Sequence, residues 1–169
     1  MPGLTRRSVN PSPAGTTEAK YSLRGESYAP SNTPGGVTAL DSVVMVRLRD
    51  GRVTSLTEPK NEAASFHISA RNFDRPGWVY VSYHPGDGRR FSDEVVAVKM
   101  DGSKGVERLA HTHSDAKGLY RAEPHAVPSR DGSRVVFASN WSRCSGAASG
   151  PKADVKAYVV EAVPALEHK

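Results

Sequence analysis

Two histidines with similar surroundings, His67 and His125, are the side chains of this sequence best suited to chemistry. They lie about 58 positions apart, and each stands near the start of a short extended segment that precedes a turn and a hydrophobic strand. An imidazole at such a place can bind a metal or move a proton, because it titrates near neutral pH. It can equally donate a hydrogen bond to the backbone of a neighbouring strand. Because the placement recurs, both interpretations stay open.

A second pair of histidines lies within the stretch His111-Thr112-His113. Alternation along a strand places both imidazoles on one face, where they could share a metal. The residues that follow, 114–118, have the composition of an exposed loop. We therefore favour a solvated strand end for this pair.

The residues around His125 predict a β-hairpin. Asp131-Gly132 supplies the positive-φ turn, and residues 134–139 are β-branched and aromatic, as in a strand. Pro124 and Pro128 exclude a helix and limit the ladder hydrogen bonds, so the inner strand must be short and close to an edge. His125 is therefore expected near a surface that solvent can reach.

The same order of segments recurs along the chain. The strands predicted at 43–48 and 95–100 are each followed by Asp-Gly, at Asp50-Gly51 and Asp101-Gly102. Each turn leads into a strand with polar alternation, at 53–57 and 106–110. Four short strands repeated every 50 to 60 residues or so are typical of a β-propeller array.

The predicted fold class is all-β, a partial β-propeller of about two and a half four-stranded antiparallel blades with a disordered N-terminal segment. Residues 42–57 supply two outer strands, residues 66–110 a complete blade, and residues 125–161 three strands of another. The expected division is a disordered or linker segment at 1–40, the partial propeller at 41–164 and a tail at 165–169. Closed propellers have about four to eight blades. The chain is thus expected to be a fragment, the interpretation that we favour, or to complete a ring with other copies of itself.

The charge pattern indicates which kinds of binding partner to expect. The net charge of +5 comes largely from scattered arginines, including Arg47, Arg49 and Arg52 on one predicted hairpin. A solvated edge accounts for them, and an anion-binding face is the alternative. No aromatic platform or basic helix accompanies these charges, so nucleic acid is not expected as a partner.

Cysteine content and hydropathy argue against several kinds of site and targeting segment. Cys144 is the only cysteine, which rules out an intramolecular disulfide and a cysteine-based zinc cluster. No apolar segment follows Arg6-Arg7, so the sequence predicts neither a signal peptide nor a transmembrane helix, and no membrane partner. The chain is expected in the cytoplasm if Met1 is the true start; a truncation would have removed the targeting signal.

These residues resemble a known family. Residues 123–132 together with 135–140 resemble the repeat of TolB-type propellers, with Arg130 where a proline is usual. His67, His125 and the passage 71–78 are similar to oligogalacturonate lyases and their relatives among the propeller polysaccharide lyases. The resemblance covers roughly residues 41–164.

The resemblance implies a metal site. In that family a divalent metal, typically manganese, is held near the propeller axis by histidines and a glutamine, several of them in a Gln-x-x-His-x-His arrangement. Here His125 matches the last position, Glu123 stands at the middle histidine and Tyr120 at the glutamine, while His67 resembles the histidine from an adjacent blade. Two ligand types have therefore changed. The set implied for this chain is His67, Glu123 and His125, which suits manganese or zinc.

The resemblance also implies a reaction, β-elimination from a uronate-containing polysaccharide. A metal or an arginine neutralises the uronate carboxylate, and a base removes the neighbouring C5 proton while the glycosidic oxygen leaves. The implied base candidates are His67 and Tyr120, and the implied carboxylate clamp is Arg71 or Arg121.

Two functions remain open. The first is a propeller segment of a polysaccharide lyase that binds an acidic glycan and cleaves it only when further blades complete it. The second is a non-catalytic TolB-like propeller module that binds protein or glycan. Whether the chain is an enzyme is left open by the sequence.

Overall fold

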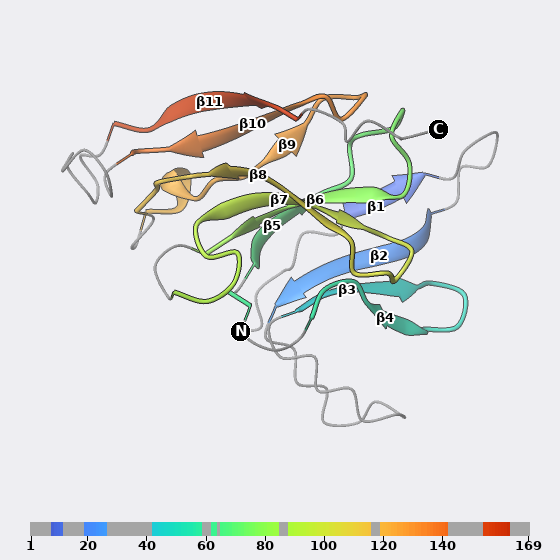
Figure 1. Cartoon of the computed structure of the whole chain (residues 1–169). Helices are drawn as coiled ribbons and strands as arrows, with labels where there is room; N and C mark the ends of the chain where they lie inside the picture. Colours follow the sequence, from blue (N-terminus) through green and yellow to red (C-terminus); the bar gives the residue numbers. More distant parts are fainter. Residues whose placement is uncertain are drawn as a thin grey trace.

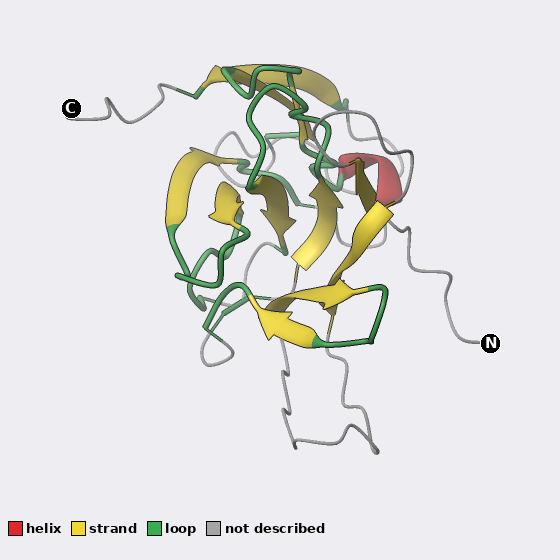
Figure 2. Ribbon diagram, turned by 90° about the vertical axis from the view of Figure 1, so that its right-hand side faces the viewer, coloured by secondary structure: helices red, strands yellow, loops and turns green. Residues whose placement is uncertain are grey.

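The computed structural model describes residues 8–11, 19–26, 42–58, 62–63, 65–84, 88–115, 119–141 and 154–162. These residues form three antiparallel sheets, and the only helical element among them is the single 3-10 turn η1 (Tyr120–Ala122) (Figure 1). Figure 2 shows that strands and their connecting loops make up nearly all of this part of the chain. The predicted all-β class is confirmed.

Each sheet is formed by strands that follow one another in the sequence. The first sheet contains β1 (Ser8–Pro11), β2 (Ala19–Glu26), β3 (Ser42–Arg47) and β4 (Val53–Ser55). The second contains β5 (Ser65–Ser69), β6 (Trp78–Tyr83), β7 (Glu94–Lys99) and β8 (Val106–His111). The third contains β9 (Val127–Pro128), β10 (Arg134–Ser139) and β11 (Lys156–Glu161). The expected four strands of the second unit and three strands of the third are confirmed.

The first sheet differs from the expectation. Residues 42–57 supply β3 and β4 as predicted, but β1 and β2 come from residues 1–40, which were expected to be disordered or a linker. The reason is backbone pairing: β2 pairs with β3 along six residues, from Tyr21 opposite Arg47 to Glu26 opposite Ser42, and so satisfies the open edge of β3. The other residues of 1–40, and the expected tail at 165–169, lie outside the described residues.

The three sheets pack face to face in chain order (Figure 1). Val79 and Val81 of β6 pack in one core with Val43 of the first sheet, whereas Tyr80 packs in another core with Val135 and Phe137 of the third sheet. Alternate residues of β6 thus face different neighbours. The second sheet is therefore buried on both faces.

The strand ends divide the molecule into a turn end and a loop end. The turn end carries the connections at 48–52, 70–77, 100–105 and 129–133, and the loop end carries the connections at 56–64, 84–93 and 112–126. The three predicted Asp-Gly turns lie at the turn end, with positive φ at Gly51, Gly102 and Gly132. In each turn the aspartate accepts the backbone N–H two residues further on, at 2.9 to 3.2 Å. Hydrogen bonds from Ser129 and Ser133 lower the pKa of Asp131 to about 2.

At the turn end a buried tyrosine links the second and third sheets. The Tyr80 hydroxyl donates a hydrogen bond to the Gly132 carbonyl (2.9 Å) and accepts one from Nη1 of Arg75 (3.0 Å). Nη2 of Arg75 also donates to both carboxylate oxygens of Glu107 at 2.8 Å, and its guanidinium lies 4.4 Å from the ring of Trp78. Gly132 is enclosed by this cluster: a Cβ there would lie 2.5 Å from Tyr80 Oη and 2.8 Å from Arg75 Cδ.

We expect Gly132→Ala to destabilise the protein more than Gly51→Ala. Both glycines have φ near +70°, which costs a residue with a Cβ about 1–2 kcal/mol, but a Cβ at position 51 meets no atom within 4 Å. The clash at position 132 adds roughly 1–3 kcal/mol. Urea unfolding of both variants measures the difference, and equal losses of stability would contradict the enclosure of Gly132.

Candidate metal centre

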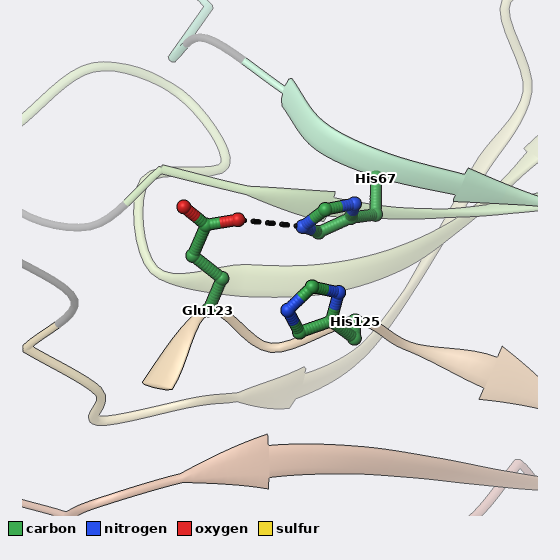
Figure 3. Close-up of side chains that lie close together, drawn as sticks. All are labelled: His67, Glu123 and His125. Carbon is green, nitrogen blue, oxygen red and sulfur yellow. Dashed lines mark hydrogen bonds and ion pairs between the residues drawn. The ribbon is translucent and has the colours of Figure 1, made fainter. Parts of the chain in front are cut away.

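Three of the residues singled out from the sequence meet at the junction between the second and third sheets (Figure 3). His67 lies on β5 opposite Ser82 of β6, on the sheet face that looks toward the third sheet. Glu123 and His125 lie in the segment between η1 and β9. The structure thus brings together the set that the resemblance implied.

The donor atoms of these three side chains lie close together. Nε2 of His67 and Oε2 of Glu123 are 2.7 Å apart, and one donor atom from each of the three residues lies within 4.8 Å of the others. The imidazoles of His67 and His125 are stacked, with ring centroids 3.9 Å apart and planes inclined by 27°. The side chains of His67 and Glu123 are 21% and 19% exposed, so the centre is shielded and still open to an entering ion.

A hydrogen bond to the second sheet holds the segment that carries His125. The Ala126 N–H donates to Oγ of Ser82 (3.2 Å), and Ser82 is fully buried. His125 itself has φ of +46°, a left-handed conformation that is uncommon outside glycine. Backbone of this kind persists only where the surrounding structure fixes it.

Polar contacts also hold the segment on the η1 side of Glu123. Oγ of Ser114 donates to the carbonyl of Ala122, and the side-chain amide of Asn140 exchanges two hydrogen bonds with the backbone of Asp115. The Glu123 N–H donates to the Tyr120 carbonyl at 3.0 Å. The carboxylate therefore projects from a segment that both neighbouring sheets hold in place.

The tautomer of His125 follows from its hydrogen bond. Its Nε2 lies 3.0 Å from the carbonyl oxygen of Tyr120, and a carbonyl can only accept, so Nε2 carries the proton. In the neutral ring Nδ1 is then the atom with a free lone pair. Metal-binding histidines are commonly oriented in this way, by a carbonyl at the nitrogen that does not bind the metal.

Tyr120 lies beside both imidazoles. Its ring meets His125 edge-on at 4.6 Å between centroids and His67 at 5.9 Å, and it is 57% exposed. Arg121 follows it in η1 and is also exposed. Arg71 is exposed in the β5–β6 loop, at the turn end, whereas η1 and Glu123 lie at the loop end. The structure thus places Tyr120 and Arg121 near the centre and Arg71 away from it.

The second histidine pair lies outside this centre. His111 is exposed at the end of β8, and the ring of His113 packs 4.6 Å from that of Trp141. Among the described residues, His67, Glu123 and His125 form the group of three or more histidine, cysteine or acidic side chains close enough to hold an ion.

The donor chemistry fits a divalent metal. Two imidazole nitrogens and one carboxylate oxygen are ligands common to zinc and manganese sites. Three protein ligands leave further coordination positions to water or to a ligand, as in catalytic zinc sites.

Unusual backbone conformations concentrate at the loop end. Six described residues other than glycine have positive φ. Phe91, Asp93, His113, His125 and Trp141 lie in or beside loop-end connections, and Lys104 lies in the β7–β8 turn. Strain of this kind is often found at binding sites.

Comparison of the chain with models of protein families, with curated proteins and with solved structures finds no match. Within the described part of the chain, no helix is long and apolar enough to cross a membrane.

The loop end also buries an acid that the sequence analysis did not identify. Glu62 is fully buried beside the first and second sheets, its Oε1 accepts the N–H of Glu58 (3.1 Å), and its backbone bridges to Arg90. Burial raises the pKa of Glu62 above its usual range. A glutamate in a loop next to Ala63 carries no pattern that signals burial, so the sequence could not reveal it.

We expect Glu62→Gln to remove a pH dependence of stability. In the unfolded chain a glutamate ionises near pH 4.3, whereas the folded chain retains the proton to higher pH. Folding therefore takes up a proton, and the free energy of unfolding falls by up to about 1.4 kcal/mol per pH unit from about pH 4 to the raised pKa. Urea unfolding of wild type and variant across this range measures the slope, and an unchanged slope in the variant would contradict the assignment.

Proposed function

We propose that the three sheets are blades of a β-propeller that binds a divalent metal, manganese or zinc, through His67, Glu123 and His125 and uses this centre to bind an acidic, uronate-containing glycan. The observation that carries the proposal is the convergence of one imidazole from β5 with a carboxylate and a second imidazole from the segment before β9, with donor atoms within 4.8 Å. The four-stranded antiparallel second sheet and its face-to-face packing with its neighbours support the propeller.

A bound metal would supply positive charge to pair with a uronate carboxylate. The side chains around the centre suit the rest of such a ligand. Tyr120 exposes its phenol beside both imidazoles, and Arg121 on the same turn can donate two parallel hydrogen bonds to a carboxylate. Both lie at the loop end, where a glycan can approach.

The reaction proposed for a completed propeller is β-elimination. Because His67 binds the metal with its basic lone pair in this proposal, Tyr120 is the base that takes the C5 proton of the uronate; the electrons of that bond form the C4–C5 double bond, and the C4–O bond breaks. The leaving glycosidic oxygen then takes up a proton. Arg71, the other clamp candidate, lies at the turn end, so Arg121 is the clamp that this geometry favours.

The second candidate function is a non-catalytic TolB-like module that binds protein or glycan. The hydrogen bond of 2.7 Å between His67 and Glu123 favours it, because such a pair can by itself hold the segment before β9 against β5. In that case the two residues stabilise the sheet junction, and metals leave the protein unchanged.

Thermal melting with manganese, zinc or a chelator distinguishes the two functions. A metal at 100 times its Kd stabilises the folded state by about 2.7 kcal/mol, which corresponds to an increase in Tm of roughly 5–10 °C for a chain of this size. We expect this increase in wild type and its loss in His67→Ala and His125→Ala. His84→Ala, an exposed histidine in the β6–β7 loop, is the control that should retain it. Melting that is unaffected by metal would overturn the metal centre.

Affinity electrophoresis in polygalacturonate or ulvan tests the glycan. We expect metal-dependent retardation that His125→Ala abolishes, without the ultraviolet absorbance of an unsaturated product, because a propeller site draws side chains from several blades. Retardation that persists in the presence of chelator would place glycan binding elsewhere. A metal-loaded protein that no polyuronate retards would contradict the glycan while leaving the metal centre intact.

A further inference from the structure

The third sheet presents an apolar face on the side away from the second sheet. Val136 of β10 and Val159 of β11 are cross-strand neighbours there and are 40% and 65% exposed. Ala138 and Ala157 form the next pair on this face. We call this set, Val136, Ala138, Ala157 and Val159, the trailing face. Its valines are more exposed than the apolar side chains in the middle of the second sheet.

The trailing face has an internal counterpart that is covered. In the second sheet the same face of β6 and β7 carries the pairs Tyr80 with Ala97 and Ser82 with Val95. These positions correspond in register to the pairs of the trailing face, and all four residues are fully buried, with Tyr80, Val95 and Ala97 packed against the third sheet. Inside the molecule, therefore, a face of this kind is covered by the apolar face of the next sheet.

The first sheet carries a matching face on its opposite side. Val44 and Val46 of β3 pair with Ser55 and Val53 of β4, on the side away from Val43, which packs against the second sheet. We call Val44, Val46 and Val53 the leading face. Val53 is 37% exposed, Val46 is half-buried and Val44 is buried.

The leading face also has an internal counterpart. In the aligned repeat its residues correspond to Val96, Val98 and Val106 of the second sheet, all of which pack in the core shared with the first sheet. The outer sides of the first and third sheets thus carry the two kinds of face that pack against each other between neighbouring sheets inside the molecule.

We infer that a second copy of this chain covers the trailing face with its leading face. Each copy provides both halves, so the contact is head to tail, and two copies can close it with six sheets in one ring, within the range of about four to eight known for propellers. Both faces have apolar centres, and the charged pair Arg134 and Glu161, 3.6 Å apart, lies at the margin of the trailing face. The inference is independent of the metal centre.

Light scattering coupled to size exclusion tests the inference through two variants, Val159→Lys on the trailing face and Val53→Lys on the leading face. Wild type is expected to have the mass of a dimer at about 100 µM. Each variant alone is expected to run as a monomer, with Kd raised on the order of tenfold or more. An equimolar mixture should form dimers again, because the intact trailing face of one variant meets the intact leading face of the other.

Phe73→Lys is the matched control, since Phe73 is an exposed apolar side chain in the β5–β6 connection, outside both faces. It should remain dimeric, and circular dichroism with thermal melting confirms that all three variants fold. A monomeric wild type would overturn the inference and assign the two faces to a different covering partner. Dimers of Val53→Lys alone would also overturn it, because they would show a symmetric contact between trailing faces.

Discussion

The second sheet is packed on both faces, and the rest of the structure depends on this constraint. Its two central strands bury side chains toward both neighbours, so β6 and β7 read as nearly continuous apolar runs. Removing either neighbour would expose a row of valines or the ring of Tyr80. Because the sheets are fixed in this order, β5 and the segment before β9 lie side by side, and that proximity creates the candidate metal centre. The site is thus a product of sheet stacking and does not belong to any single sheet.

Sequence patterns predicted most of this fold because they reflect local physics. Gly51, Gly102 and Gly132 have the positive φ that their Asp-Gly turns indicated. β1 and β2 were missed because proline, serine and glycine mask the alternation in residues 1–40, and because pairing with β3 is a long-range contact. Tertiary pairing of this kind overrides local propensity.

The candidate site was predicted in part. His67 and His125 were singled out because they recur in the repeat, whereas their grouping with Glu123 in one metal site, and the place of Tyr120, followed from the family resemblance. Ser82 was missed, since a serine in a valine-rich strand carries no sign that its hydroxyl holds the segment of His125. The position of Arg71 at the turn end was not predicted either, because the sequence does not specify to which end of a sheet a loop side chain reaches. Such features depend on three-dimensional packing of segments far apart in the chain.

The contrast between the two ends of the sheets has a consequence for how such a protein can change. At the turn end, short Asp-Gly turns determine strand register, and a one-residue insertion there would exchange the inner and outer faces of a strand. At the loop end the connections are longer, and they carry five of the six described non-glycine residues with positive φ and two of the candidate metal ligands, Glu123 and His125. Residues can be inserted or substituted in those loops without altering the register of the strands. The architecture therefore separates a fixed geometry from an adaptable surface, and new ligand preferences can arise at one end while the other keeps the fold.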